Sequence, residues 1–119
     1  MLRKSFTALA LTLVAPLAFA HASLTSSQPA DGAELATAPT ELVFDFSEGV
    51  ETSLSQVTLE DEAGQAIEIG ALTADASGTH RYRVELPELA PGQYSVEVKV
   101  TSVDTHRIED SLEFTVQPD

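Results

Sequence analysis

Histidine is the only side chain in this 119-residue sequence that could bind a transition metal strongly through nitrogen, and it occurs at His21, His80 and His106. Cysteine is absent, which excludes disulfides, thiolate metal sites and cysteine nucleophiles. Asp104 precedes His106 by two residues. If this segment is extended, the two side chains point to the same side and present a carboxylate beside an imidazole.

The first twenty residues have the three parts of a secretory signal peptide. Arg3 and Lys4 supply a positive charge, residues 6–17 form an apolar run, and Ala18-Phe19-Ala20 is a typical cleavage site. The apolar run is shorter than the roughly 20 residues that a membrane-spanning helix needs. We therefore expect residues 1–20 to be a cleaved signal peptide and residues 21–119 to form one exported domain.

Cleavage after Ala20 would make His21 the first residue, with a free α-amino group beside its imidazole. These two nitrogens can close a chelate ring, and Asp104 and His106 would add one oxygen and one nitrogen. Such a donor set suits a divalent ion in tetragonal geometry, Cu(II) first and Ni(II) next, with Zn(II) as an alternative. A methionine-rich Cu(I) site is excluded, because Met1 is the only methionine.

Other polar features have ordinary explanations. His80 follows Ser77-Gly78-Thr79 and is interpreted as an exposed turn histidine, with a weak secondary metal contact as the alternative. The run Glu60-Asp61-Glu62 is interpreted as a hairpin tip, since it lacks the spacing of an EF-hand calcium loop. No nucleophile elbow, phosphate loop or zinc-protease motif is present, so we expect a protein that is not an enzyme.

The charge of the chain restricts its partners. After cleavage, four basic and 19 acidic residues would give a formal charge of −15. Nucleic acid and anionic lipid are therefore excluded as partners.

The elements that must position these residues are β-strands. Apolar residues alternate with polar ones over residues 42–46, 57–59, 82–86, 94–100 and 112–116, with shorter strands near Leu24 and over residues 67–72. Turn residues separate these runs. About seven antiparallel strands are typical of an all-β Greek-key sandwich or barrel, cupredoxin-like or immunoglobulin-like.

Four ordered motifs resemble the CopC family of exported copper-resistance proteins. They are HASL and SQPADG within residues 21–32, LVFDFSE over residues 42–48, LAPGQYSV over residues 89–96 and SVDTH over residues 102–106. Thr105 stands where the family usually has glycine in the last motif, and Gly49 stands where proline commonly follows F-S-E.

The resemblance implies a cupredoxin-like fold that binds one Cu(II) ion in the periplasm. It implies His21, Asp104 and His106 as ligands, and Glu48 as a neighbour that forms a hydrogen bond beside the site. It also implies copper resistance, sequestration or delivery, with a CopD-like inner-membrane protein as the partner. We expect the protein itself to be a monomer. The alternative is an immunoglobulin-like interaction module without a metal site.

Overall fold

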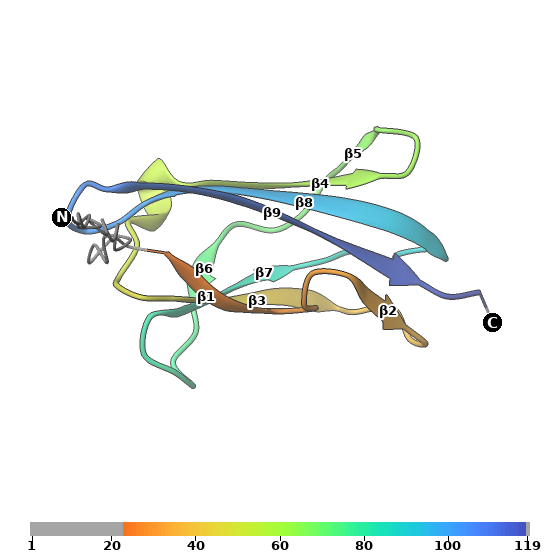
Figure 1. The fold of residues 1–119 in the computed structure, drawn as a ribbon, viewed down its shortest axis with the longest axis horizontal. Coiled ribbons are helices and arrows are strands. Elements are labelled where there is room, and N and C mark those ends of the chain that lie inside the picture. The colour runs from red at the N-terminus through yellow and green to blue at the C-terminus, as the bar shows by residue number, and fades with distance from the viewer. Residues whose placement is uncertain (1–22, 119) are drawn as a thin grey trace, which may run out of the picture.

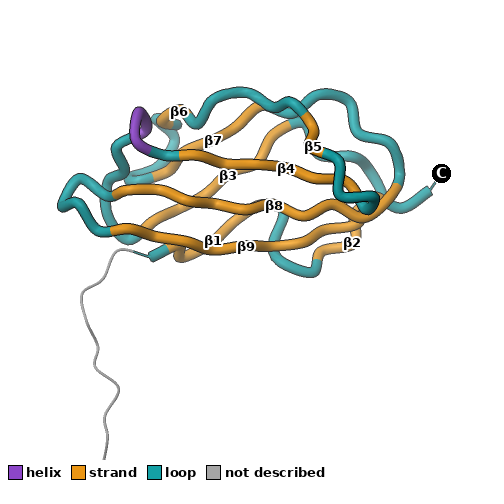
Figure 2. The backbone as a smooth tube through the Cα atoms, turned by 90° about the horizontal axis from the view of Figure 1, so that it is seen from above, coloured by secondary structure: helices purple, strands orange, loops and turns teal. Residues whose placement is uncertain are grey.

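A computed structural model of the chain describes residues 23–118, which form two β-sheets packed face to face (Figures 1 and 2). The four-stranded sheet contains, in spatial order, β1 (Leu24–Gln28), β3 (Glu41–Phe46), β7 (Arg81–Glu85) and β6 (Thr73–Ala74). The five-stranded sheet contains β2 (Ala33–Leu35), β9 (Arg107–Val116), β8 (Gly92–Thr101), β4 (Gln56–Asp61) and β5 (Ala66–Ile67). A single 3-10 turn, η1 (Thr52–Leu54), lies between β3 and β4.

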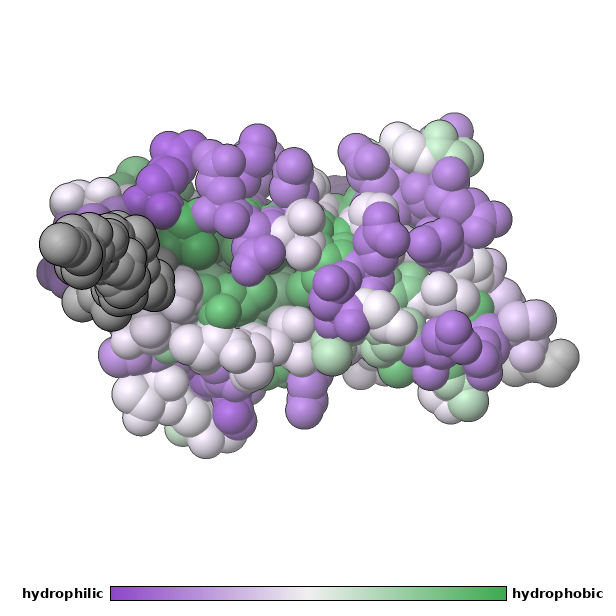
Figure 3. Space-filling view, viewed as in Figure 1, coloured by the Kyte–Doolittle hydropathy of each residue, from purple (hydrophilic) through white to green (hydrophobic). Residues whose placement is uncertain are grey.

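The core forms between the two sheets because each long strand has one apolar face. On β8, Val96, Val98 and Val100 are at most 1% exposed, while the residues between them are exposed. Leu42 and Phe44 of β3 face them from the other sheet and are fully buried. Burying a side chain of this size contributes about 1.5–3 kcal/mol, so these alternating residues hold the sheets together. Hydrophobic side chains are visible in the hollow between the sheets, with hydrophilic ones around it (Figure 3).

The predicted all-β architecture is confirmed, and it is an open sandwich and not a closed barrel. The predicted number of strands was too low, because residues 23–118 form nine. The strand expected over residues 67–72 is not formed; instead, two short strands, β5 and β6, lie at the two ends of this segment and belong to different sheets. The intervening segment crosses between the sheets, and the N–H of Gly70 donates to the carbonyl of Glu85 on the way. A crossing segment cannot continue either ladder, which explains the interruption.

Strand β2 was not predicted, and it also breaks the expected antiparallel pattern. Its three residues pair in parallel with the end of β9, where Ala33 lies opposite Phe114. The preceding turn fixes this register: the carboxylate of Asp31 accepts the N–H of Glu113, and the N–H of Gly32 donates to the Glu113 carbonyl. A strand of three residues is too short for the period-two signal to be recognised.

One end of the sandwich carries the segments that the sequence singled out. Strand β3 ends there and leads into residues 47–51, while β8 and β9 are joined there by residues 102–106. Strands β1 and β7 begin at the same end (Figure 1). We call this the hairpin end of the sandwich. No helix within residues 23–118 is long and apolar enough to cross a membrane.

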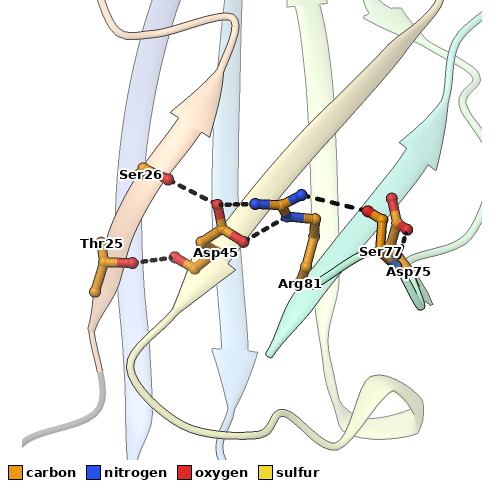
Figure 4. A network of polar contacts seen from close by, with 6 residues as sticks. All are labelled: Thr25, Ser26, Asp45, Asp75, Ser77 and Arg81. Atoms are coloured by element: carbon orange, nitrogen blue, oxygen red, sulfur yellow. Dashed lines mark hydrogen bonds and ion pairs between the residues drawn. The ribbon is translucent and has the colours of Figure 1, made fainter. Parts of the chain in front are cut away.

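A polar network ties β1, β3 and β7 together near this end, on the outer face of their sheet (Figure 4). Nε of Arg81 lies 2.8 Å from Oδ1 of Asp45, and the hydroxyl of Ser26 donates to Oδ2 at 2.8 Å. The hydrogen bond from Arg81, followed by that from Ser26, lowers the pKa of Asp45 below its ordinary value. In the adjacent loop, hydrogen bonds from Ser77 lower the pKa of Asp75. The network therefore fixes the strand ends from which residues 47–51 project.

Candidate metal centre

Glu48, Asp104 and His106 converge at the hairpin end of the sandwich. One donor atom from each side chain lies within 4.8 Å of the others. Glu48 comes from the segment after β3, whereas Asp104 and His106 come from the turn between β8 and β9. Nδ1 of His106 lies 4.0 Å from Oε2 of Glu48. Asp104 and His106 are exposed and Glu48 is half-buried. The cluster is therefore accessible to solvent on the side of Asp104 and His106, and the carboxylate of Glu48 forms its partly buried side.

The turn that presents Asp104 and His106 is built around Ser102. The Ser102 hydroxyl accepts the N–H of Asp104 at 3.2 Å and the N–H of His106 at 3.0 Å. The N–H of Thr105 also donates to the Ser102 carbonyl at 2.8 Å. Ser102 is fully buried, and it is the only buried residue with a non-aromatic polar side chain in the described chain. Its single hydroxyl therefore sets the backbone positions of both proposed ligands.

The predicted extended conformation of residues 104–106 is wrong. Thr105 has a φ angle of +70°, in the left-handed region that non-glycine residues rarely adopt. The chain thus reverses at Thr105, and the turn, not strand alternation, brings Asp104 and His106 together. This conformation also explains why glycine would suit position 105.

The segment that carries Glu48 is attached to this turn by backbone hydrogen bonds. The N–H of Val103 donates to the carbonyl of Gly49 at 2.9 Å, and the N–H of Glu51 donates to the carbonyl of Thr101 at 2.8 Å. On the other side, the Tyr82 hydroxyl accepts the N–H of Val50 at 2.8 Å. These hydrogen bonds attach the backbone on the C-terminal side of Glu48 to the β8–β9 turn and to strand β7.

The first described residue, Ser23, is attached beside Glu48. Its N–H donates to the hydroxyl of Ser47 at 2.8 Å, and its carbonyl accepts the N–H of Ser47 at the same distance. The chain therefore enters the sandwich at the cluster. His21, the expected third ligand residue, and the expected signal peptide lie outside the described residues.

The chemistry of the cluster fits a metal ion. Oε1 of Glu48 is buried and has no hydrogen-bond partner in the described part of the chain, which is costly for a carboxylate unless an ion or a donor approaches it. Two carboxylates and an imidazole are ordinary ligands of borderline divalent ions. Because metal–nitrogen and metal–oxygen bonds are about 2.0–2.2 Å long, only a small closure of the cluster would bring all three donors onto one ion.

The other polar residues that the sequence singled out lie away from the cluster of Glu48, Asp104 and His106. His80 is exposed, has a φ angle of +58° and is not part of the cluster, although its carbonyl accepts the N–H of Phe46 at 3.1 Å. Asp61 accepts the N–H groups of Ala63 and Gln65, which agrees with a hairpin tip in this region. The role of Ser102 was not predicted; its only signal in the sequence was a serine two residues before Asp104.

Comparison with known proteins identifies the family. Residues 24–117 match the model of the CopC domain. The chain is 37% identical over 111 residues to copper resistance protein C of Pseudomonas syringae pv. tomato, a match that covers 88% of this chain and 87% of that protein.

Similar solved structures indicate the same family. The crystal structure of CopC from Methylosinus trichosporium OB3b superposes with a TM-score of 0.76 at 31% identity and covers 82% of this chain and 95% of that one. PcoC of Escherichia coli, described as a methionine-rich copper resistance protein, superposes with a TM-score of 0.72 at 25% identity, over 82% of this chain and 99% of that one. On the evidence of its sequence and its fold, this chain belongs to the CopC family of copper-resistance proteins.

Proposed function

We propose that the processed protein binds one Cu(II) ion through the α-amine and imidazole of His21, the carboxylate of Asp104 and the imidazole of His106. The observation that carries this proposal is the meeting of three segments at one end of the sandwich. Ser23 is bonded to Ser47, and Glu48 beside it lies against the turn of Asp104 and His106.

The reach of the chain supports His21 as a ligand residue. Consecutive Cα atoms are about 3.8 Å apart, so His21 lies no more than about 7–8 Å from Ser23 along the backbone. Ser23 itself is fixed beside Ser47, the residue before Glu48. This tether is short enough for an N-terminal histidine to reach the cluster, which supports the proposal. A chelate of amine and imidazole would then complete a donor set of three nitrogens and one oxygen, which favours tetragonal Cu(II).

Glu48 has a different role in this proposal. Its carboxylate lies 4.0 Å from Nδ1 of His106, which is too long for a hydrogen bond but needs a movement of only about 1 Å to become one. A carboxylate that accepts the second ring N–H of a histidine fixes the orientation and tautomer of that ligand. We therefore propose that Glu48 orients His106 and that Nε2 of His106 binds the ion.

We infer that the protein works as a copper carrier in the periplasm and not as an enzyme. The expected signal peptide at residues 1–20 would export it, and cleavage would create the amine that the site needs. Bound copper would be sequestered or passed to a CopD-like protein of the inner membrane. Support comes from the family, since the compared relatives are named for copper resistance.

The test is electron paramagnetic resonance of the processed chain, starting at His21, with one equivalent of Cu(II). We expect one tetragonal type-2 signal with nitrogen hyperfine structure. When more copper is added, we expect no second signal from a tightly bound ion. A spectrum of hydrated Cu(II), or several weak oxygen-bound species, would contradict the proposal. That outcome would favour the alternative of an immunoglobulin-like interaction module without a metal site.

A further inference from the structure

Strand β9 carries a charged residue at a position that its alternation assigns to the core. Asp110 is exposed, although the pairing with β8 is continuous and places it opposite Val98, which is fully buried. Directly opposed residues of neighbouring strands point to the same face of a sheet, so Asp110 stands on the core-facing side of β9. The other residues on this side of β9 are buried and apolar; they are Ile108, Leu112, Phe114 and Val116.

Asp110 lies where β9 forms the margin of its sheet (Figure 2). Strand β2 pairs with β9 only over residues 114–116, and no strand within residues 23–118 pairs with residues 107–112 on the side away from β8. The N–H and carbonyl of Glu113 bond to Asp31 and Gly32, which lie on that side. Because backbone groups alternate in direction along an antiparallel strand, those of Ser111 and Glu109 also point away from β8. Residues 107–112 are therefore a free edge.

The carboxylate of Asp110 occupies part of this free edge. Its Oδ1 accepts the N–H of Ser111 at 2.8 Å, and this N–H is one of the donors that point away from β8. A strand that paired with the free edge would need the same donor, so the carboxylate would have to leave it. The charge would then be enclosed between the new strand and the apolar side of the sheet without a partner, which is costly.

The other edges of the sandwich are protected in different ways. Strand β2 has three residues, and β5 and β6 have two each. Strand β1 is longer, but its register shifts between Leu24 and Ser26. Short edge strands and irregular registers are two common features that prevent a sheet from pairing with another chain, and an inward-facing charge is a third. The free edge of β9 is neither short nor irregular, and Asp110 gives it the third kind of protection.

We propose that Asp110 prevents this protein from pairing with a second copy of itself through the free edge of β9. Two such edges can pair antiparallel around a two-fold axis, so that donors of each copy meet acceptors of the other. A dimer of this kind would enclose two Asp110 carboxylates. The surplus of 19 acidic over six basic residues in the chain opposes association further. The inference is independent of copper and gives a physical basis for the expected monomer.

The test compares Asp110→Val with Glu97→Val by sedimentation velocity over a range of protein concentrations. A chelator is present, so that copper cannot bridge two copies. Both substitutions remove one exposed carboxylate and add the same side chain, but Glu97 lies in β8, which is paired on both sides. We expect Asp110→Val to dimerise about 10–100-fold more tightly than the unmodified chain, and Glu97→Val to behave as the unmodified chain does.

Hydrogen exchange locates the interface of the dimer. In the Asp110→Val dimer, the N–H groups of Glu109 and Ser111 should exchange more slowly than in the monomer. Asp110→Asn is the second variant, because it removes the charge and keeps an oxygen that can accept the N–H of Ser111. It should dimerise more tightly than the unmodified chain and less tightly than Asp110→Val, and it decides the result if Asp110→Val does not fold.

Two results would overturn the role of Asp110. The first is that Asp110→Val associates no more tightly than Glu97→Val. The second is a dimer of Asp110→Val in which the N–H groups of Glu109 and Ser111 exchange as fast as in the monomer, because its interface would then lie elsewhere.

Discussion

Ser102 and His106 are joined by a reciprocal pair of hydrogen bonds. The hydroxyl of Ser102 accepts the N–H of His106 at 3.0 Å, and the N–H of Ser102 donates to the carbonyl of His106 at 2.8 Å. These bonds close the turn between β8 and β9 at its base. Since Ser102 is fully buried, water cannot replace its hydroxyl as the acceptor of these N–H groups.

The first prediction is that Ser102→Ala weakens both the fold and the metal centre. The substitution leaves the N–H groups of Asp104 and His106 without their acceptor, and an unsatisfied buried group costs about 1–3 kcal/mol. We also expect a loss of about 10–100-fold in Cu(II) affinity, the range for a residue that orients ligands. Urea unfolding and competitive copper titration measure the two effects.

Ser55→Ala is the matched control for Ser102. The hydroxyl of Ser55 accepts the N–H of Thr101 at 3.2 Å and donates to the carbonyl of Glu51, so it organises the same end without touching residues 102–106. This variant should lose stability and keep its copper spectrum. Equal loss of copper affinity in both variants would show that Ser102 acts through general stability.

The second prediction concerns the left-handed residue in the turn. Thr105→Gly should raise the free energy of unfolding by up to about 1 kcal/mol, because glycine adopts a φ of +70° without the steric cost that a β-branched residue meets. The Thr105 hydroxyl donates to the Asp104 carbonyl, and loss of this bond limits the gain. Thermal unfolding of the metal-free protein is the measurement. A clear decrease in the melting temperature would contradict it.

The third prediction separates ligands from bystanders. Asp104→Ala and His106→Ala should each remove tight Cu(II) binding while the fold survives, because both side chains are exposed and outside the core. His80→Ala should change the copper spectrum little, since His80 is not part of the cluster. Competitive titration with each variant gives the ranking. A loss with His80→Ala as large as that with His106→Ala would mean that another pair of histidines forms the site.

Glu48→Gln is the intermediate variant in this series. It keeps the shape of the side chain and removes its charge, so the proposed hydrogen bond to His106 is weakened while the ligands stay in place. We expect a loss of about 10–100-fold in Cu(II) affinity. A complete loss, equal to that of His106→Ala, would indicate that Glu48 binds the ion directly.

The fourth prediction is a pH dependence that comes from Asp45. Hydrogen bonds from Arg81 and Ser26 lower the pKa of Asp45 in the folded chain, whereas the unfolded chain has the ordinary value of about 3.9. The resulting stabilisation is present above that ordinary value and is lost as the pH falls through the lower folded pKa. Asp45→Asn should therefore be less stable than the unmodified chain at pH 6, and the difference should shrink towards pH 3.

Urea unfolding of both chains between pH 6 and pH 3 measures this difference. If the difference in unfolding free energy between the two chains stayed constant from pH 6 to pH 3, the contribution of Asp45 would not depend on its charge. Ser26→Ala is a further check, because it removes the second hydrogen bond that lowers the pKa and leaves Arg81 in place.

Strands with a long alternating pattern were predictable from the sequence, and short or irregular elements were not. Strand β8 is an example, because its burial alternates at every position from Tyr94 to Val100. Strand β2 depends on hydrogen bonds between residues about 80 positions apart, such as that between Asp31 and Glu113, which leave no local pattern. The split of residues 66–74 between β5 and β6 depends in the same way on which sheet each end joins.

For the candidate site, the proximity of Asp104 and His106 was more predictable than the backbone conformation that produces it. The spacing of Asp104 and His106 pointed correctly to a shared location, but for the wrong reason, because Thr105 reverses the chain between them. The resemblance to the CopC family supplied Glu48, which the structure brings to the same cluster. The buried hydroxyl of Ser102 could not be recognised, since its importance depends on burial and on two backbone donors that only the folded turn brings together.

The most direct measurement of the central claim is a competitive Cu(II) titration of two chains that differ by one residue at the N-terminus. One chain begins at His21, and the other carries a single additional glycine before it. Our account predicts that the added residue lowers the affinity by several orders of magnitude, because the α-amine no longer closes a chelate ring with the imidazole of His21. Equal affinities for the two chains would contradict the assignment of His21 and, with it, the proposed copper site.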